Sequence, residues 1–198
     1  MKFNSHPELV GKHAFLSPSG YHWIRYTDDK ILDRLETSMS AQHGTRLHEI
    51  AAELINLGIN LPKTQTTLNM YVNDAIGFRM SPEVSLMASY NAFGTADAIS
   101  FRKERVKDKV MTLRIHDLKN GVHPAKMDQL KIYAAYFCIE YAVNPNDIHV
   151  ELRIYQNDDF SFTNSIEDPD LGADILTIMG RTLHFDKLIT DRRLEVLG

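Results

Sequence analysis

The chain has 198 residues, 43% of them hydrophobic and 24% charged, which is typical of one folded globular domain and excludes an intrinsically disordered protein. The formal net charge of −4 argues against a protein that coats nucleic acid through charge alone, because such proteins are usually basic overall. The single cysteine, Cys138, excludes an internal disulfide and a four-cysteine zinc or iron–sulfur site within one chain.

The first 80 residues predict helices. Ser17 and Pro18 predict the start of a short helix over 18–26. A strongly periodic helix is expected to open at Gly44 and to end at Gly58, with an apolar stripe that consists of Leu47, Ile50, Leu54 and Leu57. A further helix is expected over 68–80.

After Pro82 the pattern changes to strands, which are expected over 83–90, 93–101 and 110–118. The charged run 102–109, with five basic and two acidic residues, suits a hairpin between the second and third strands. It is expected mainly as a solvated turn, with phosphate contact as the alternative.

A long helix over 124–143, a strand over 148–155 and a final helix over 170–184 complete the predicted order. The strand–helix–strand segment 110–155 has the length of a right-handed crossover between parallel strands. The expected fold class is therefore α/β, with a central mixed β-sheet flanked by helices.

No apolar stretch approaches the roughly 18 residues that a membrane-spanning helix needs, so no membrane partner is expected. The lack of disulfides agrees with a reducing compartment. A cytoplasmic location is the expectation.

The strand that ends in Asp117-Leu118-Lys119 places two charged side chains on an otherwise apolar face. Buried charges are costly unless something pairs with them, so Asp117 and Lys119 form either a structural ion pair or a functional site. Asp97 lies on a similar apolar face of the preceding strand. If the two strands form a hairpin, Asp97 and Asp117 converge, and a hard divalent cation, magnesium or manganese, would relieve their repulsion.

The side chains of His48, Gln129 and Tyr133 are further candidates for this site, and Lys119 could take part in its chemistry. His48 lies at the margin of the apolar stripe and could supply a nitrogen ligand, although a histidine on a helix is more often a packed or solvent-facing residue. Gln129 and Tyr133 are four residues apart and so share one face of the long helix. Lys119 could orient a nucleophile and stabilise developing negative charge.

Four blocks of the chain carry a family resemblance: Gly44–Glu49 as a G-x-x-x-H helix, Phe93–Ala98 as a G-x-x-D strand, Asp117–Lys119 as a D-x-K strand end, and Gln129–Tyr133 as a Q-x-x-x-Y helix. In this order they resemble the PD-(D/E)XK nuclease superfamily in its RecB-like branch. Residues 13–19 and 153–156 are also similar to segments of a phage-encoded group of this branch.

The resemblance implies a restriction-endonuclease-like core over about 81–198, a helical segment over about 1–80, and one nuclease domain over the whole chain. It implies that His48, Asp97, Asp117 and the backbone carbonyl of Leu118 bind the metal, and that Asp97, Asp117 and Lys119 are catalytic. Gln129 and Tyr133 would support the site and touch the nucleic-acid backbone.

The function expected from the resemblance is a magnesium- or manganese-dependent deoxyribonuclease that processes DNA ends as an exonuclease in phage replication or recombination, in the cytoplasm of a bacterial host. Expected partners are DNA, as double-stranded ends or single strands, and a single-strand-binding or recombination protein; self-assembly into a homo-oligomer is a further option. The alternatives are a non-catalytic DNA-binding or assembly module and an RNA-directed nuclease. Local contacts with DNA are expected at Arg102, Lys103, Arg105, Arg192 and Arg193.

Overall fold

The computed structural model of the chain describes residues 16, 24–121 and 124–197, which form parts of two compact units, Met1–Arg46 and Leu47–Gly198. The helix expected over 18–26 falls mostly outside the described residues. No helix in the described part of the chain is both long enough and apolar enough to cross a bilayer.

Helix α1 (Asp28–Leu57) begins well before the expected start at Gly44, so that prediction was wrong. Thr27 caps the helix, because its Oγ1 accepts a hydrogen bond of 3.3 Å from the Lys30 N–H. Asp28 and Asp29 follow in the first turn, where negative charge is favourable. Gly44 is tolerated inside the helix, since a single interior glycine costs only about 1 kcal/mol.

The second unit contains the last turns of α1 and an α/β core. Its further elements are α2 (Thr67–Gly77), β1 (Ser81–Ser89), β2 (Ala92–Val106), β3 (Lys109–Leu118), α3 (Asp128–Glu140), the short 3-10 helix Pro145–Asp147, β4 (His149–Gln156), β5 (Asp159–Asn164) and α4 (Leu171–Leu197).

The five strands form one sheet in the order β1-β2-β3-β4-β5. Strands β3 and β4 are parallel, and α3 connects them, whereas the other neighbours are antiparallel. The predicted α/β class with a central mixed sheet flanked by helices is therefore confirmed. Strand β5 and the C-terminal half of α4 were not predicted. The expected turn 102–109 is mostly strand, with only Lys107 and Asp108 in the turn itself.

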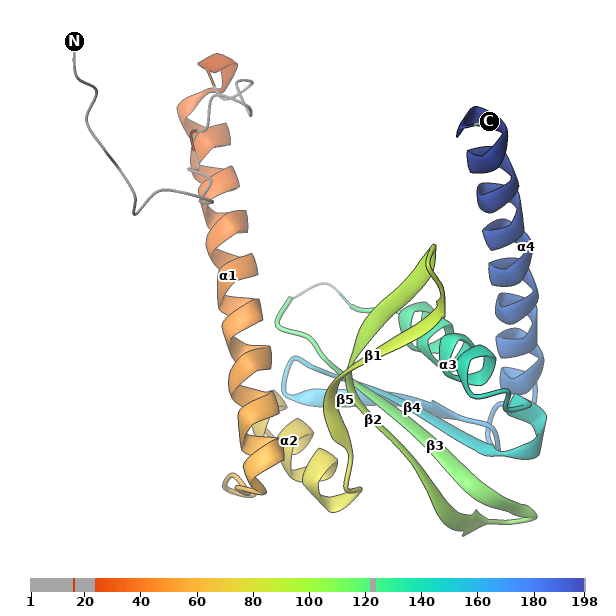
Figure 1. Cartoon of the computed structure of the whole chain (residues 1–198). Coiled ribbons are helices and arrows are strands. Elements are labelled where there is room, and N and C mark those ends of the chain that lie inside the picture. The colour runs from red at the N-terminus through yellow and green to blue at the C-terminus, as the bar shows by residue number, and fades with distance from the viewer. Residues whose placement is uncertain (1–15, 17–23, 122–123, 198) are drawn as a thin grey trace. The chain divides into compact units, whose positions relative to one another are not determined.

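Helices cover both faces of the sheet (Figure 1). Helices α3 and α4 pack on one face, against a core that includes Ile99, Leu113, Ile115, Leu152 and Ile154. The last turns of α1 and helix α2 pack on the other face, near Ala98, Leu118 and Tyr155. Two apolar layers therefore enclose the sheet close to the expected positions of Asp97 and Asp117.

The buried face of α1 matches the predicted stripe in part, because Leu47 and Leu54 pack against the core. Ala51 and Ile55 are the buried residues, whereas Ile50 and Leu57 are 41% and 64% exposed. Tyr141, which follows the buried Phe137 by four residues at the end of α3, is 55% exposed. The buried surface of each helix combines large and small residues, with Ile55 beside Ala51 in α1, and Leu130 and Phe137 beside two alanines in α3.

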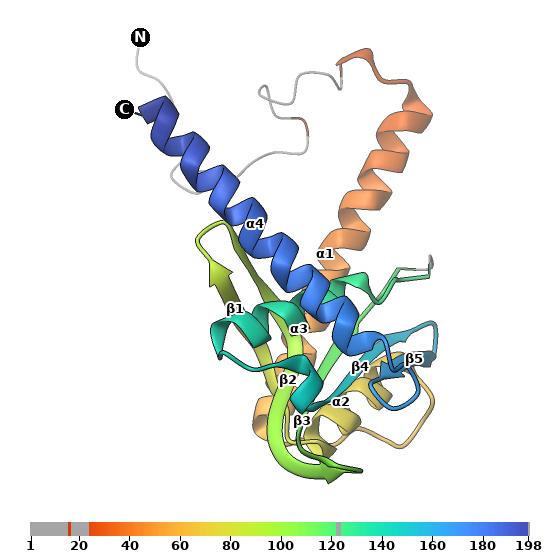
Figure 2. The ribbon, with the colours of Figure 1, turned by 90° about the vertical axis from the view of Figure 1, so that its right-hand side faces the viewer.

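Helix α4 runs past the tip of the β1–β2 hairpin (Figure 2). Asp186 Oδ1 accepts hydrogen bonds from Ser89 Oγ at 2.6 Å and from Asn91 Nδ2 at 2.8 Å. Arg193 Nη1 donates to Asn91 Oδ1 at 2.6 Å. These polar contacts hold the hairpin tip where apolar packing has ended.

A charged network lies on the α2 face of the sheet, where Arg153 Nη1 donates to Asp74 of α2 at 3.1 Å. Arg114 donates two hydrogen bonds to Glu104, of 2.6 and 2.7 Å, and its Nε lies 3.4 Å from Glu151. Arg153 Nε donates to Glu151 at 2.9 Å. The ring of Phe78 covers both guanidinium groups, at 4.3 and 5.1 Å from its centre. Burial would raise the pKa of Glu151, but His116 and the charges of Arg153 and Arg114 lower it to about 2.

Glu151 predicts a pH dependence of stability. Its folded-state pKa is below the unfolded value, so the stabilisation is present above pH 4.5 and is lost as the pH falls from 4.5 toward 2. We expect a loss on the order of 3 kcal/mol in the free energy of unfolding across this range. Urea unfolding as a function of pH measures it. Glu151→Gln should remove most of this slope, and the exposed Glu167→Gln should keep it; equal slopes in both variants would contradict the assignment.

Candidate metal centre

Three carboxylates form a row across neighbouring strands at one end of the sheet. Ala98 pairs with His116 between β2 and β3, so one further step places Asp97 opposite Asp117. Pro82 and Val84 pair with Ala98 and Ala96 between β1 and β2, which places Glu83 opposite Asp97. Opposite residues of paired strands project from the same face. The row therefore gathers three negative charges in one place.

His48 approaches this row from α1. It precedes Ala51 by three residues and Ile55 by seven, so it lies on the face of α1 that packs on the sheet. Its Nδ1 is 3.4 Å from Asp97 Oδ2. Ligand atoms of His48, Glu83 and Asp97 all lie within 4.8 Å of one another, which is close enough for one cation to contact all three.

Asp117 lies outside that close group and pairs with Lys119 instead. Lys119 Nζ is 2.9 Å from Asp117 Oδ2 and 3.1 Å from Oδ1, and only the second contact has hydrogen-bonding geometry. The buried Oδ2 therefore has an ion-pair partner but no hydrogen bond. Asp97 Oδ2 accepts a hydrogen bond of 2.9 Å from the Leu118 N–H, which ties the two strand ends together.

Helix α3 holds the other side of Lys119. Lys119 Nζ donates to Gln129 Oε1 at 3.0 Å, and Gln129 Nε2 donates to Tyr133 Oη at 3.4 Å. The Tyr133 ring lies against the backbone of β2 at Gly94, where a Cβ atom would be 3.0 Å from Tyr133 Cε1. The absence of a side chain at Gly94 therefore makes room for the Tyr133 ring.

The charges of the row perturb one another. Burial and the charge of Asp97 raise the pKa of Asp117, and the same two causes raise the pKa of Glu83. The contact with Asp97 raises the pKa of His48, and the charges of Glu83 and Asp117 act in the same direction. The negative charge of the three carboxylates therefore exceeds the positive charge that His48 and Lys119 supply.

The residues that the sequence singled out as ligands, catalytic groups or supports lie near one another, whereas the basic residues expected to contact DNA lie elsewhere. His48, Asp97, Asp117, Lys119, Gln129 and Tyr133 are linked through these contacts, and Leu118 takes part through its N–H. Arg102, Lys103 and Arg105 lie five to eight residues beyond Asp97 along β2, which is a distance of about 16 Å or more at roughly 3.3 Å per residue. Arg193 contacts the β1–β2 hairpin tip.

The sequence interpretation missed Glu83. Its backbone has a φ of 51°, in the left-handed region that a residue other than glycine seldom adopts, and such strain is common at functional sites. Counting back from the turn at Tyr90 and Asn91 would bring Val84 opposite Asp97. The register shift between Met87 and Ser89 brings Glu83 there instead, and the sequence carries no sign of that shift.

No family model matches this chain, and no curated protein or solved structure matches it. The geometry of the residues is therefore the main support for a function.

The ion pair between His48 and Asp97 predicts a measurable titration. We expect the pKa of His48 to lie above its ordinary value of 6.5 and to fall toward that value in Asp97→Asn, because the variant removes the facing charge. NMR titration of the imidazole resonances in metal-free buffer measures this. Glu53→Gln, which removes an exposed carboxylate from the same helix, should leave the pKa of His48 unchanged. An unchanged pKa in Asp97→Asn would show that the pair does not form in solution.

Proposed function

We propose that the chain is a magnesium- or manganese-dependent nuclease that hydrolyses phosphodiester bonds of DNA. The observation that carries the proposal is the convergence of His48, Glu83 and Asp97 within 4.8 Å, beside the ion pair of Asp117 and Lys119. Carboxylate oxygens with an imidazole nitrogen are a donor set that suits these ions. The raised pKa of Glu83 and of Asp117 supports a need for further positive charge there.

In this proposal Glu83, Asp97 and His48 would hold the cation, and the carboxylate of Asp117 would stand beside them. A bound divalent cation supplies Lewis acidity, which lowers the pKa of a water molecule and polarises a phosphoryl oxygen. Since Asp117 Oδ2 is buried and accepts no hydrogen bond, it can accept a new partner without breaking one.

Lys119 orients the attacking water and stabilises the negative charge that develops on the phosphate. Its Nζ is positioned for this by Asp117 on one side and by Gln129 on the other. Tyr133, seated against Gly94, fixes the side-chain amide of Gln129 and thereby the direction of Lys119. Gln129 and Tyr133 therefore act by positioning the ammonium group of Lys119.

The resemblance of the four sequence blocks to RecB-like nucleases supports DNA-end processing by an exonuclease in phage replication or recombination as the role of this activity. The second candidate is a DNA-binding or assembly module without catalysis. It rests on the Lys119–Asp117 ion pair, which would serve a purely structural purpose in such a protein. An RNA-directed nuclease differs only in the substrate cleaved.

Cleavage assays separate these functions. With linear and circular DNA or RNA and manganese, we expect DNA cleavage that chelation abolishes. Lys119→Ala should lower the cleavage rate on the order of a hundredfold or more, because it removes the group that orients the nucleophile. The exposed Lys63→Ala serves as a matched control and should cleave like the wild type. DNA binding without cleavage in the wild type would support the module and refute the nuclease.

Gly94→Ala tests the contact between β2 and α3. The added Cβ would press on the Tyr133 ring, so Gln129 and Lys119 should shift, and the cleavage rate should fall on the order of tenfold. Gly77→Ala is the control, because a Cβ there meets no atom within 4 Å. Thermal unfolding followed by circular dichroism should confirm that both variants are folded. Wild-type activity in folded Gly94→Ala would contradict the positioning role of Tyr133.

A further inference from the structure

Strand β2 has an unpaired edge over nearly half its length. Strand β1 pairs with it from Ala92 to Ile99, where Ser81 is the last partner, but β2 continues to Val106. Over residues 100–106 it pairs with β3 on one side, and no strand of the described chain pairs with it on the other. Edge N–H and C=O groups of this kind are a template for an added extended chain.

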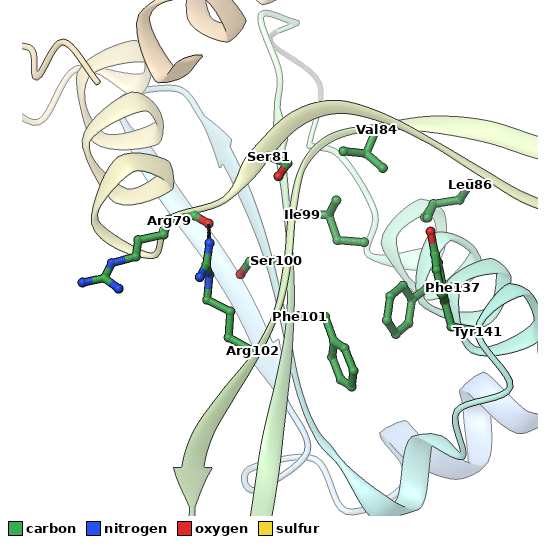
Figure 3. Close-up of a pocket in the computed structure, with 10 residues that line it drawn as sticks. All are labelled: Arg79, Ser81, Val84, Leu86, Ile99, Ser100, Phe101, Arg102, Phe137 and Tyr141. Atoms are coloured by element: carbon green, nitrogen blue, oxygen red, sulfur yellow. Dashed lines mark hydrogen bonds between the residues drawn. The ribbon is translucent and has the colours of Figure 1, made fainter. Parts of the chain in front are cut away.

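A cavity of about 310 Å³ lies where β1 departs from this edge (Figure 3). Its apolar wall consists of Val84, Leu86, Ile99, Phe101, Phe137 and Tyr141. The aromatic rings adjoin one another, with 5.0 Å between the centres of Phe101 and Phe137 and 4.8 Å between those of Phe137 and Tyr141. Figure 3 shows Phe101, Phe137 and Tyr141 on the same side of β2. The cavity can take one apolar side chain, which would cover the half-exposed Tyr141 ring.

The rim of the cavity is positively charged. Arg102 is held there, because its Nε and Nη2 donate to the Arg79 carbonyl oxygen at 3.2 and 2.7 Å. Four more basic residues lie further along the hairpin, namely Lys103, Arg105, Lys107 and Lys109. Of the two acidic residues in this run, Glu104 is bound by Arg114 and Asp108 lies 3.3 Å from Lys109. A partner at this edge therefore meets an excess of positive charge.

We propose that this groove binds an extended segment of a partner protein, which adds a strand beside residues 100–106 of β2, inserts one apolar side chain into the cavity and places acidic side chains beside Arg102. Backbone hydrogen bonds along the edge supply affinity, and the cavity and the basic rim supply selectivity. A nucleic acid would match the positive rim, but its phosphate backbone has neither an amide ladder for the edge nor an apolar side chain for the cavity. The proposal does not depend on the nuclease activity.

Fluorescence anisotropy tests the proposal with labelled peptides of about nine residues. Each peptide consists of threonines around a single leucine, isoleucine or phenylalanine, which is the anchor for the cavity. Its last two residues are aspartates in one set of peptides and lysines in the other. Whole-chain protein is used, as wild type and as Lys119→Ala, in buffer with a chelator. We expect the aspartate set to bind with a Kd on the order of 10–100 µM for the best anchor, equally in both proteins. The lysine set should bind at least about tenfold more weakly.

Two variants and their controls locate the binding. Arg102→Glu and Tyr141→Ser each replace an exposed side chain of the groove, and each should weaken the aspartate set about tenfold. Arg181→Glu and Tyr90→Ser make the same changes at exposed positions outside the groove and should bind like the wild type. The proposal is overturned if no peptide binds below about 1 mM, if both peptide sets bind equally, or if the groove variants bind like the wild type. Displacement of the peptide by duplex DNA would instead assign the groove to nucleic acid and overturn the proposal as well.

Discussion

Mutual repulsion of three carboxylates is the constraint on which the rest of this structure depends. Glu83, Asp97 and Asp117 stand on adjacent strands, two of them partly or fully removed from water. Placing like charges there is unfavourable, and the apolar layers on both faces of the sheet offset the cost. The imidazole of His48 and the ammonium of Lys119 reduce it further. Each cationic group comes from a segment whose packing places it: His48 from the buried face of α1, and Lys119 from the end of β3.

The sequence predicts those features of the site that depend on the alternation of apolar and polar residues along a strand. Asp97 and Asp117 could be expected to meet, because each interrupts an apolar strand face and a hairpin joins the strands. The parallel crossover through α3 is predictable in the same way from element length and order. Glu83 has no such signature, since it comes after Pro82 at an irregular start of β1 with a positive φ.

Other elements escaped prediction for physical reasons of their own. Gly44 suggests a helix start, but glycine is only mildly unfavourable inside a helix, and the cap at Thr27 lies far upstream. Strand β5 is short and mostly exposed, so its alternation is weak, although Asn157 and Asp158 form the turn with positive φ that a tight hairpin requires. Tyr141 continues the helical period of α3 beyond the point where the sheet can cover it.

The close packing of the Tyr133 ring against Gly94 restricts which substitutions these two positions can accept during evolution. The strand backbone at 94 and the ring at 133 share one limited volume, so neither position can grow unless the other shrinks. Relatives that carry alanine or serine at 94 would be expected to carry a smaller side chain at 133, and to hold the amide at 129 by some other neighbour. Substitution at these two positions would then be correlated, through steric exclusion alone and without any direct bond between them.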